Sequence, residues 1–309
     1  MRYLSALEQH RHFGRAAQAC HITQPALSNA LRALESEFGV TIVRRGRQYE
    51  GLTPEGTKVL ATAQRMLHER EVLHQELHAL AERPTGHLVV GAVPTATPVA
   101  ARFAAWLRAR HPGIKPALRS LSSSEIESGI ENLSLDLAFG YAERAGARPS
   151  RIEVHAQYDE HYFLLRRRTA PRGGARHRIG EPILWADAAK LPLCMLTREM
   201  HNRSIIDSSF AAAGATVQPV IETNAVLTLV LSVLAGDVNS VMPGALVAIA
   251  LQYPELEALP LVDPVVVTRI GLLLPSGNLR SLAQHAAIRL AADADWLAHA
   301  SAHSGLLQG

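Results

Sequence analysis

The sequence predicts a chain of the α/β class, in which a small helical unit and one long helix precede a larger two-lobed α/β domain. Residues 1–58 show short helical patterns separated by tight turns, and residues 59–86 keep one helical pattern without a clear break. Residues 87–309 alternate strand-like and helical segments, which is typical of a mostly parallel sheet. A length of 309 residues is sufficient for two domains.

The composition is that of a globular protein and excludes several classes. Hydrophobic residues make up 48% and charged residues 19%, which does not fit a disordered or collagen-like chain. The longest apolar run, residues 225–235, is shorter than the roughly 20 residues that span a bilayer. The sequence opens without a secretory pattern, and its two cysteines are too few for a disulfide scaffold. We therefore expect a soluble cytoplasmic protein that does not contact a membrane.

The third predicted helix of the N-terminal unit is the best defined. Thr23 suits its N-cap and Pro25 its first turn, while Gly39 is a typical residue just beyond a helix end. Apolar residues recur along it at spacings of four, three and four, which predicts one buried stripe: Leu27, Leu31, Leu34 and Phe38. Two shorter helices are expected before it, and a hairpin is expected over residues 41–52.

The opposite face of this helix is polar, and the preceding turn makes the whole pattern that of a winged helix-turn-helix. Residues 1–58 carry eight Arg or Lys against five Asp or Glu, a local excess of +3 that suits a polyanion. Gln and Arg side chains can read base edges, and arginines on the hairpin can reach phosphates. The predicted DNA-contacting residues are Thr23, Gln24, Pro25, Ser28, Asn29, Arg32, Arg44, Arg45 and Arg47.

The long helix that follows carries a heptad pattern. Thr53 and Pro54 suit its start, and the segment of residues 84–86 ends it. Apolar residues seven apart, with others at the intermediate position, predict a dimerisation seam rather than packing on one domain alone. The residues assigned to that seam are Val59, Met66, Leu73, Leu77 and Leu80.

Residues 87–309 are expected to form two lobes, one of residues 87–161 and 266–309 and the other of residues 162–265, with a ligand between them. Polar residues that start helices or follow strands are the candidate ligand contacts. Helix N-termini offer free N–H groups and favour anions, and an arginine fork suits a carboxylate. The candidates are Thr95, Thr97, Ser122, Ser123, Thr197, Arg203, Thr223 and Asn224, although each hydroxyl could equally be a helix cap.

Other chemistries have little support in the sequence. Two histidine pairs spaced by four, at residues 74 and 78 and at residues 299 and 303, lack further ligands, so no metal site is expected. Nucleotide-binding and hydrolase motifs are absent, and we expect neither an enzyme nor a bound cofactor.

One segment carries a specific resemblance. Residues 13–28, Phe-Gly-Arg-Ala-Ala-Gln-Ala-Cys-His-Ile-Thr-Gln-Pro-Ala-Leu-Ser, continue through Leu31, Leu34-Glu35 and Phe38-Gly39, and Leu52-Thr53-Pro54-Glu55-Gly56 follows later. This series resembles the DNA-binding signature of LysR-type transcriptional regulators and the start of their linker helix. The sequence departs from the family pattern at Ile42-Val43, where Leu-Phe is usual, and at Ala235-Gly236-Asp237-Val238, where a second glycine is usual.

The resemblance runs along the whole chain and implies both architecture and partners. It implies an effector domain similar to periplasmic binding proteins, a homodimer or homotetramer on a double-stranded DNA operator, contact with RNA polymerase, and a small-molecule co-effector. Some family members sense peroxide through a disulfide within the effector domain. Only Cys194 lies in that domain here, and Cys20 lies in a DNA-binding helix, which makes such a switch unlikely in this chain.

The effector expected from the sequence is a small anionic metabolite. Residues 193–215 and 231–246 resemble regulators associated with formate dehydrogenase operons, so formate is the candidate carboxylate. Two alternatives remain at this point. A constitutive architectural DNA-binding protein would show no ligand-dependent footprint, and a solute-binding protein would have a secretory signal and no helix-turn-helix.

Overall fold

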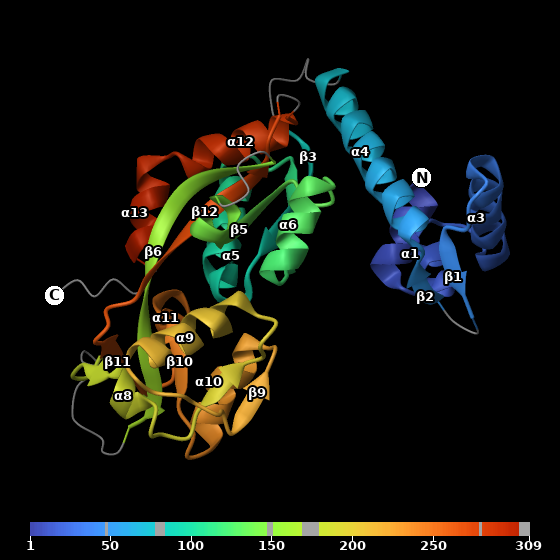
Figure 1. The fold of residues 1–309 in the computed structure, drawn as a ribbon. Coiled ribbons are helices and arrows are strands. Elements are labelled where there is room, and N and C mark those ends of the chain that lie inside the picture. The colour runs from blue at the N-terminus through green and yellow to red at the C-terminus, as the bar shows by residue number, and fades with distance from the viewer. Residues whose placement is uncertain (47–48, 78–83, 147–150, 169–178, 278–279, 303–309) are drawn as a thin grey trace. The chain divides into compact units, whose positions relative to one another are not determined.

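The structure is a computed structural model that describes residues 1–46, 49–77, 84–146, 151–168, 179–277 and 280–302. The chain divides into two compact units, one built mainly from residues 1–82 and the other mainly from residues 83–309. Figure 1 shows the elements of both units. No helix in the described part of the chain is long and apolar enough to cross a membrane.

The first unit is a three-helix bundle with a hairpin. Its helices are α1 (Arg2–His10), α2 (Phe13–Ala19) and α3 (Gln24–Phe38). The Thr23 hydroxyl accepts a hydrogen bond from the Ala26 amide, and Gly39 ends α3 with a left-handed φ of 64°, as the sequence predicts. Leu27 and Leu31 are buried, whereas Phe38 is exposed at the far end of the helix.

The hairpin is joined to α3 by a carboxylate. Strands β1 (Val43–Arg45) and β2 (Tyr49–Leu52) are antiparallel. Glu35 accepts hydrogen bonds from the backbone amides of Ile42 at 2.9 Å and of Val43 at 3.1 Å. These bonds satisfy the backbone donors of two buried residues, and they set the position of the hairpin relative to α3.

The helix α4 (Pro54–Leu77) starts against the same hairpin. The Thr53 hydroxyl donates to the Thr41 carbonyl at 2.6 Å and accepts from the Gly56 amide at 2.9 Å. A Cβ atom at Gly56 would lie 2.1 Å from the Ile42 carbonyl oxygen. This close backbone approach explains why the helix start needs glycine in its first turn.

The first lobe of the larger unit is a mixed sheet covered by helices. Its strands follow the order β4 (Ile114–Ser120), β3 (Gly86–Ala92), β5 (Leu137–Tyr141), β12 (Val267–Pro275) and β6 (Ile152–Arg167). Strands β4, β3 and β5 are parallel, and β12 is antiparallel to both neighbours. Its helical elements are η2 (Pro94–Ala96), α5 (Thr97–Arg110), α6 (Ser123–Glu131), α7 (Ala142–Gly146), α12 (Leu282–Ala291) and α13 (Ala294–Ala302).

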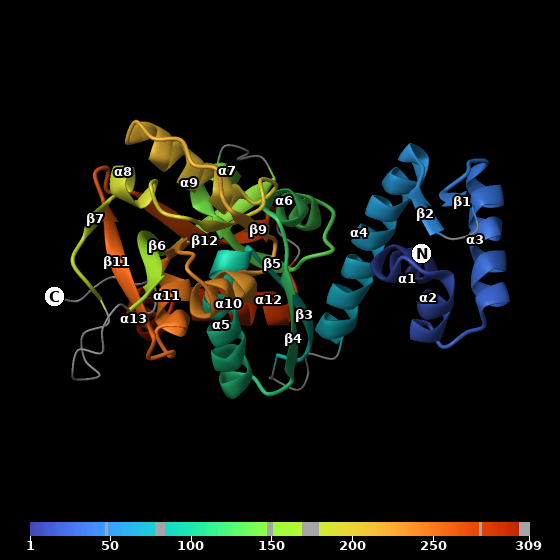
Figure 2. The ribbon, with the colours of Figure 1, turned by 90° about the horizontal axis from the view of Figure 1, so that it is seen from below.

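The second lobe is built on the other half of β6. Its strands are β7 (Ile183–Leu184), β8 (Cys194–Leu196), β9 (Ile221–Thr223), β10 (Ser240–Pro243) and β11 (Leu256–Val262). Strands β10 and β11 pair with β6, and β8 is parallel to β9. Its helices are α8 (Trp185–Ala188), α9 (His201–Ala212), α10 (Val226–Ala235) and α11 (Gly244–Ala250). Helix α11 packs against η2 and α5 of the first lobe. Figure 2 shows α11 next to α5.

One strand therefore belongs to both lobes. Along β6, His161 pairs with Val267 of β12, and the next residue, Tyr162, pairs with Pro243 of β10. Figure 1 shows β6 running from the first lobe into the second. The change of partner between two adjacent residues marks the junction of the lobes.

The sequence predicts most of these elements but misplaces several. The sequence predicts an extended segment only at residues 162–165, whereas β6 spans 16 residues. The first half of β6 is missed because charged side chains interrupt its apolar pattern. One C-terminal helix is expected, but Asp293 accepts from the Trp296 amide and starts α13 as a separate helix. Strand β11 and helix α11 are not predicted. The insertion expected at residues 168–181 lies largely outside the described residues.

Candidate functional site

The outer face of α3 is the first candidate site. Gln24, Asn29 and Arg32 are exposed and Ser28 is half-buried. Residues 24, 28 and 32 are four apart, so they follow one face of the helix. The Asn29 side chain accepts a hydrogen bond from Arg32 at 3.3 Å. This face offers amide, hydroxyl and guanidinium groups that can approach a nucleic acid groove.

The start of α3 and the hairpin flank this face. Thr23 and Pro25 are exposed in the first turn, where Thr23 also caps the helix. Arg44 is exposed on β1. The side chain of Arg45 and the whole of Arg47 lie outside the described residues, so their predicted phosphate contacts stay predictions.

Helix α4 presents two large apolar side chains to solvent. Met66 and Leu73, which are seven residues apart, are each 53% exposed. Val59 instead packs partly against the core of the first unit, so it is less available to a seam than the sequence suggests. The side chain of Leu77 and the whole of Leu80 lie outside the described residues.

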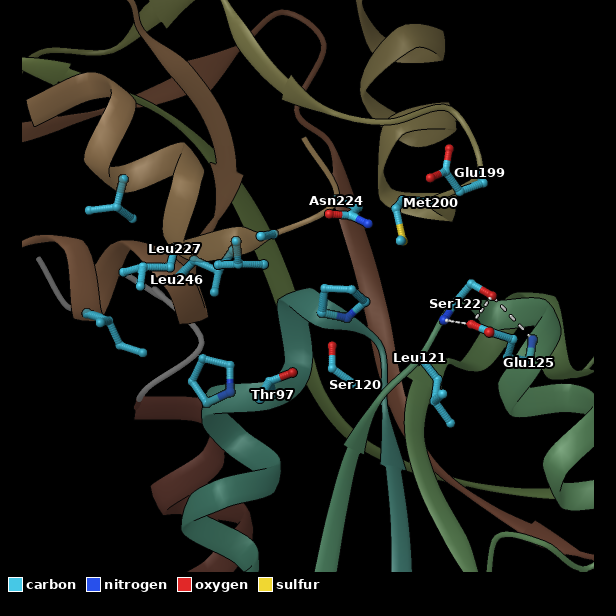
Figure 3. A pocket seen from close by; sticks show the side chains of 16 residues that line it. Thr97, Ser120, Leu121, Ser122, Glu125, Glu199, Met200, Asn224, Leu227 and Leu246 are labelled. Atoms are coloured by element: carbon cyan, nitrogen blue, oxygen red, sulfur yellow. Dashed lines mark hydrogen bonds between the residues drawn. The ribbon is translucent and has the colours of Figure 1, made fainter. Parts of the chain in front are cut away.

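A pocket lies between the two lobes of the larger unit. It has a volume of about 950 Å³, within the range of sites for metabolite-sized or drug-sized ligands. In the first lobe its walls are the segments that follow β3 and β4. In the second lobe they are the segment before α9, the start of α10 with the segment before it, and α11 (Figure 3). Most of the lining is apolar: Pro94, Pro98, Leu121, Met200, Ala225, Val226, Leu227, Val230, Leu246 and Ile249.

The polar lining contains two carboxylates and no described lysine, arginine or histidine. It consists of Thr97, Ser120, Ser122, Glu125, Glu199 and Asn224. Ser122 donates to Glu125 from both its amide and its hydroxyl, each at 2.8 Å. In the second lobe, the Thr197 hydroxyl donates to Glu199 at 2.6 Å, and this bond lowers the pKa of the Glu199 carboxyl. The bond from Thr197 therefore favours the ionised form of Glu199.

The structure brings together three of the eight predicted effector residues. Thr97, Ser122 and Asn224 line the pocket, whereas Thr95, Ser123, Thr197, Arg203 and Thr223 do not. Thr95 and Ser123 are buried. Thr197 bonds Glu199, and the Thr223 hydroxyl accepts from the Ala225 amide, so these two hydroxyls serve local structure.

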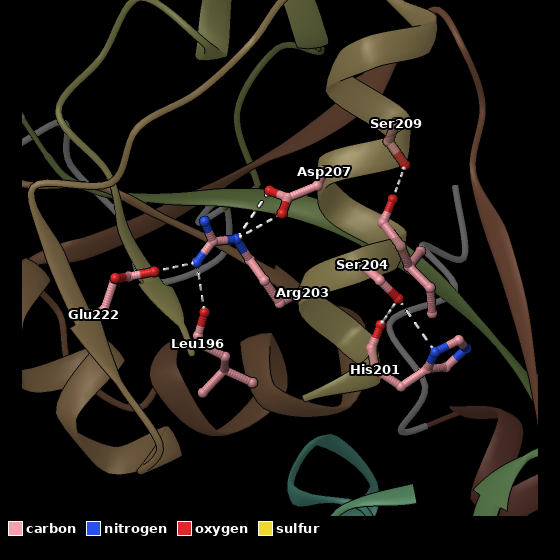
Figure 4. Close-up of polar contacts among 8 residues, drawn as sticks. Leu196, His201, Arg203, Ser204, Asp207, Ser209 and Glu222 are labelled. Carbon is pink, nitrogen blue, oxygen red and sulfur yellow. Dashed lines mark hydrogen bonds and ion pairs between the residues drawn. The ribbon is translucent and has the colours of Figure 1, made fainter. Parts of the chain in front are cut away.

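The structure does not place Arg203 in the pocket between the lobes, where the sequence predicts that it holds an anion. Its side chain is 1% exposed and lies against a separate, smaller cavity. The guanidinium donates to Asp207 at 2.9 Å, to Glu222 at 2.6 Å and to the Leu196 carbonyl at 2.8 Å (Figure 4). Burial alone would lower the pKa of Arg203, but the bonds to Glu222 and Asp207 outweigh it and raise the pKa. Arg203 thus joins α9 to β8 and β9.

The pocket also argues against a small carboxylate such as formate. With Arg203 engaged elsewhere, no described lysine or arginine lines the cavity, whereas the carboxyl groups of Glu125 and Glu199 do. A carboxylate ligand would lose its hydration on entering a mostly apolar cavity and would find no charged partner there, so its binding would cost desolvation free energy. Formate has too few atoms to fill a cavity of this size.

The two cysteines lie in different units. Cys20 is buried at the end of α2, and Cys194 is buried in β8, where burial raises the pKa of its thiol. A raised thiol pKa reduces the thiolate fraction and thus the reactivity. Within the described residues, no group of three or more His, Cys, Asp or Glu side chains could hold a metal ion.

The family follows from two matches that together span most of the chain. Residues 1–57 match the model of the bacterial regulatory helix-turn-helix protein, lysR family, and residues 81–296 match that of the LysR substrate binding domain. The chain belongs to the LysR family. The N-terminal match covers α3 and the hairpin, and the second match covers all residues that line the pocket.

Two characterised regulators are similar in sequence to different lengths of this chain. The chain is 32% identical over 139 residues to the hydrogen peroxide-inducible genes activator of Pectobacterium carotovorum. Those residues are 45% of this chain and 46% of that protein. It is 30% identical over 216 residues to the HTH-type transcriptional regulator SsuR of Burkholderia cenocepacia. This match covers 68% of this chain and 67% of that protein. The chain thus spans about half the length of the peroxide-inducible relative.

A solved LysR-family structure shows the same fold. Full-length CbnR complexed with its target DNA is 18% identical, covers 97% of this chain and 98% of its own, and superposes with a TM-score of 0.65. At this identity the likeness concerns the fold alone.

The apolar pocket residues are the ones that sequence reasoning missed. Leu227, Leu246 and Ile249 lie on α10 and α11 and were not assigned to the site. A signal was present, because residues 225–235 are apolar on most of the helix surface and only Thr228 and Ser232 interrupt them. A surface helix needs only one apolar face, and α10 carries further apolar side chains, Leu227 and Leu231, that are exposed. Leu227 is the one of these two that lines the pocket.

We predict that Arg203→Met lowers the stability of the larger unit without altering ligand binding between the lobes. The Leu196 carbonyl loses its donor and the link between α9 and β9 is broken, which costs about 1–3 kcal/mol for unpaired buried groups. Urea unfolding measures the loss. The exposed Arg198 supplies a matched control, Arg198→Met, and equal stability of the two variants would contradict the structural role.

Proposed function

We propose that this chain is a transcriptional regulator that binds a DNA operator through α3 and responds to an organic effector between its lobes. The observation that carries the proposal is the exposed face of Gln24, Ser28 and Arg32 on the second helix of a helix-turn-helix. Gln pairs with adenine and Arg with guanine in the major groove, while Arg44 reaches a flanking phosphate. A constitutive architectural role is less well supported, because the same chain carries a metabolite-sized pocket.

The protein acts on DNA as a dimer in this proposal. Met66 and Leu73 are the support, since two large apolar side chains at heptad spacing are half-exposed on one helix. A homodimer would present two recognition helices to the two halves of an operator. Tetramer formation and contact with RNA polymerase remain predictions from the family resemblance.

The effector in this proposal is a neutral or cationic molecule with an apolar body. The apolar walls provide the contact area, Thr97 and Asn224 provide hydrogen bonds, and Glu125 with Glu199 attract a donor or a positive charge. Peroxide sensing through a disulfide within the effector unit is not favoured, because Cys194 is the only cysteine of that unit and is buried.

For DNA recognition, we expect Arg32→Ala to reduce the preference for operator over random DNA by about 1–3 kcal/mol, because a base-reading contact is lost. Arg44→Ala should weaken operator and random DNA equally and lower the salt dependence by about one phosphate contact. Fluorescence anisotropy at several salt concentrations measures both effects. Arg108→Ala, on an exposed position of α5, is the control, and an unchanged operator preference in Arg32→Ala would refute the assignment.

For assembly, we expect Leu73→Asp to give monomers and to lose operator affinity, because a charge at the seam is buried in the dimer without a partner. Light scattering coupled to size-exclusion chromatography measures the mass. Arg65→Asp places the same residue at an exposed position outside the heptad seam and should stay dimeric. A Leu73→Asp protein that remains fully dimeric would show that another surface holds the subunits together.

For the effector, we compare ligands with one apolar body and different charge: phenethylamine, 2-phenylethanol and phenylacetate. Phenethylamine should bind at least about tenfold more tightly than phenylacetate, a difference of about 1.4 kcal/mol, because the pocket holds carboxylates and no described cation. Calorimetry measures the affinities, and formate serves as the small-carboxylate comparison.

Two alanine-to-tryptophan variants locate the effector site. Ala225→Trp fills the pocket and should abolish binding, while Ala211→Trp, exposed on α9 away from it, should not. Tighter binding of phenylacetate than of phenethylamine would overturn the proposed effector class without affecting the DNA-binding role.

A further inference from the structure

A buried carboxyl lies at the junction of the lobes. The Glu160 side chain is completely buried, and one of its oxygens accepts a hydrogen bond from the Tyr158 hydroxyl at 3.2 Å. The other oxygen has no hydrogen-bond partner in the described part of the chain. No described lysine or arginine forms an ion pair with this carboxyl. Buried carboxylates normally have a cation or several donors, so this group requires an explanation.

The surroundings of Glu160 come from both lobes. The Tyr141 hydroxyl of β5 lies 3.1 Å from the Thr95 hydroxyl of η2, and its ring contacts the His201 ring of α9 at 4.9 Å. Two further bonds meet at the hydroxyl of Tyr162, which is 3.3 Å from both Thr268 of β12 and Asn202 of α9. These side chains form one polar cluster around the junction.

The position of Glu160 in β6 makes it sensitive to the arrangement of the lobes. Glu160 pairs with Thr268 in the sheet of the first lobe, and Tyr162, two residues later, pairs with Pro243 in the second. Any rotation of one lobe against the other must change the backbone at this point. The same rotation would move His201 and Asn202, which are on α9, away from the tyrosines of the first lobe.

The other charged groups around the cluster are already paired. Arg269 of β12 bonds Asp159 at 2.8 Å on the opposite face of β6, and Arg144 of α7 bonds Glu127 of α6. His201 of α9 has its pKa lowered by burial and by Arg144. Strand β10 and helix α11 carry no titratable side chain. In the described part of the chain, β12, α7, β10 and α11 thus supply no unpaired lysine or arginine to Glu160.

The tyrosines do not supply a charge either. Burial raises the pKa of Tyr141, Tyr158 and Tyr162, so all three hydroxyls are neutral across the accessible pH range. Burial likewise raises the pKa of Glu160 to about 8, and the bond from Tyr158 offsets only part of this increase. In the arrangement described here, Glu160 is therefore mainly a neutral acid at pH 7.

We propose that Glu160 is a proton-linked latch, a side chain whose protonation state controls how the two lobes are arranged. Its neutral form stabilises the described arrangement of the lobes. Its ionised form favours an arrangement in which water reaches the carboxylate. An ionised carboxylate without a cation cannot remain in this cluster at low cost, because the surrounding hydroxyls cannot replace its full hydration. Separation of the lobes at the β6 junction hydrates it. The latch goes beyond the proposed effector response, and its tests require neither an effector nor DNA.

The pH dependence has a defined sign. In the unfolded chain the Glu160 carboxyl has its ordinary pKa of 4.5, and in the folded chain the pKa is about 8. The folded state then holds one more proton between these two values. Stability from this group is complete below pH 4.5, falls as the pH rises toward about 8, and is constant above that.

Thermal unfolding of the full chain between about pH 5 and about pH 9 provides the first test. Glu160→Gln keeps the shape and removes the titration, so its melting temperature should fall less over this range than that of the wild type. Glu181→Gln, at an exposed position of the same unit, should follow the wild type. Identical pH profiles for wild type and Glu160→Gln would overturn the proposal.

Infrared difference spectroscopy tests the protonation state directly. The wild type near pH 6 should show the carbonyl band of a neutral carboxylic acid that Glu160→Gln lacks, and the band should disappear as the pH passes about 8. Tyr158→Phe removes the only described donor to the carboxylate and should move the disappearance to higher pH. These wild-type and Tyr158→Phe titrations decide the question even if Glu160→Gln does not fold, and absence of the band near pH 6 refutes the latch.

Amide hydrogen exchange tests the link to lobe motion. Near pH 9, residues 159–162 and 200–203 should exchange several-fold faster in the wild type than in Glu160→Gln, and near pH 6 the two proteins should be alike. The comparison is made at one pH, so the intrinsic exchange rates cancel. Equal exchange at both pH values would show that Glu160 titrates without acting as a latch.

Discussion

The sharing of β6 between two lobes is the constraint on which the larger unit depends. A strand has two edges for backbone hydrogen bonds, and β6 uses them for β12 along one half and for β10 and β11 along the other. Because each half of β6 pairs with strands of its own lobe, the lobes can move against each other without breaking sheet pairing only where β6 changes partners, at His161 and Tyr162, and where β11 leads into β12. This restraint keeps the pocket walls of the two lobes opposite each other, which a flexible linker would not do.

Local patterns account for most of what the sequence predicts correctly. Thr23 and Gly39 set the ends of α3 through contacts within a few residues, so capping rules alone predict them. The first half of β6 escapes such rules, because Asp159 is paired with Arg269, which is 110 residues away. In sequence alone, the charged residues in the first half of β6 are typical of a loop. The ion pair with Arg269 is what makes Asp159 compatible with a strand inside the sheet.

The same distinction explains the outcome at the pocket. Thr97, Ser122 and Asn224 are found from sequence because helix starts in open α/β sheets face the ligand crevice. Arg203 was misassigned because its partners Glu222 and Asp207 are not evident from sequence, although Asp207 is four residues away on the same helix. Leu227 and Leu246 were missed because an apolar side chain at a ligand surface looks the same as one in a core.

The charged residues that line the pocket favour a selectivity that depends on the exclusion of anions as much as on attraction of the proposed ligand. Glu125 and Glu199 already have hydroxyl donors, so they do not need a ligand to be satisfied. An anion in the pocket would face two carboxylates with no described cation among the lining residues, while a neutral apolar molecule would meet no such penalty. Glu160 is a further carboxyl of the larger unit that lies in β6 outside the pocket lining, and burial raises its pKa so that the neutral form is favoured. An ionised Glu160 in its cluster and an anion in the pocket would each be buried without a described cation, and the same cost of removing a charge from water disfavours both.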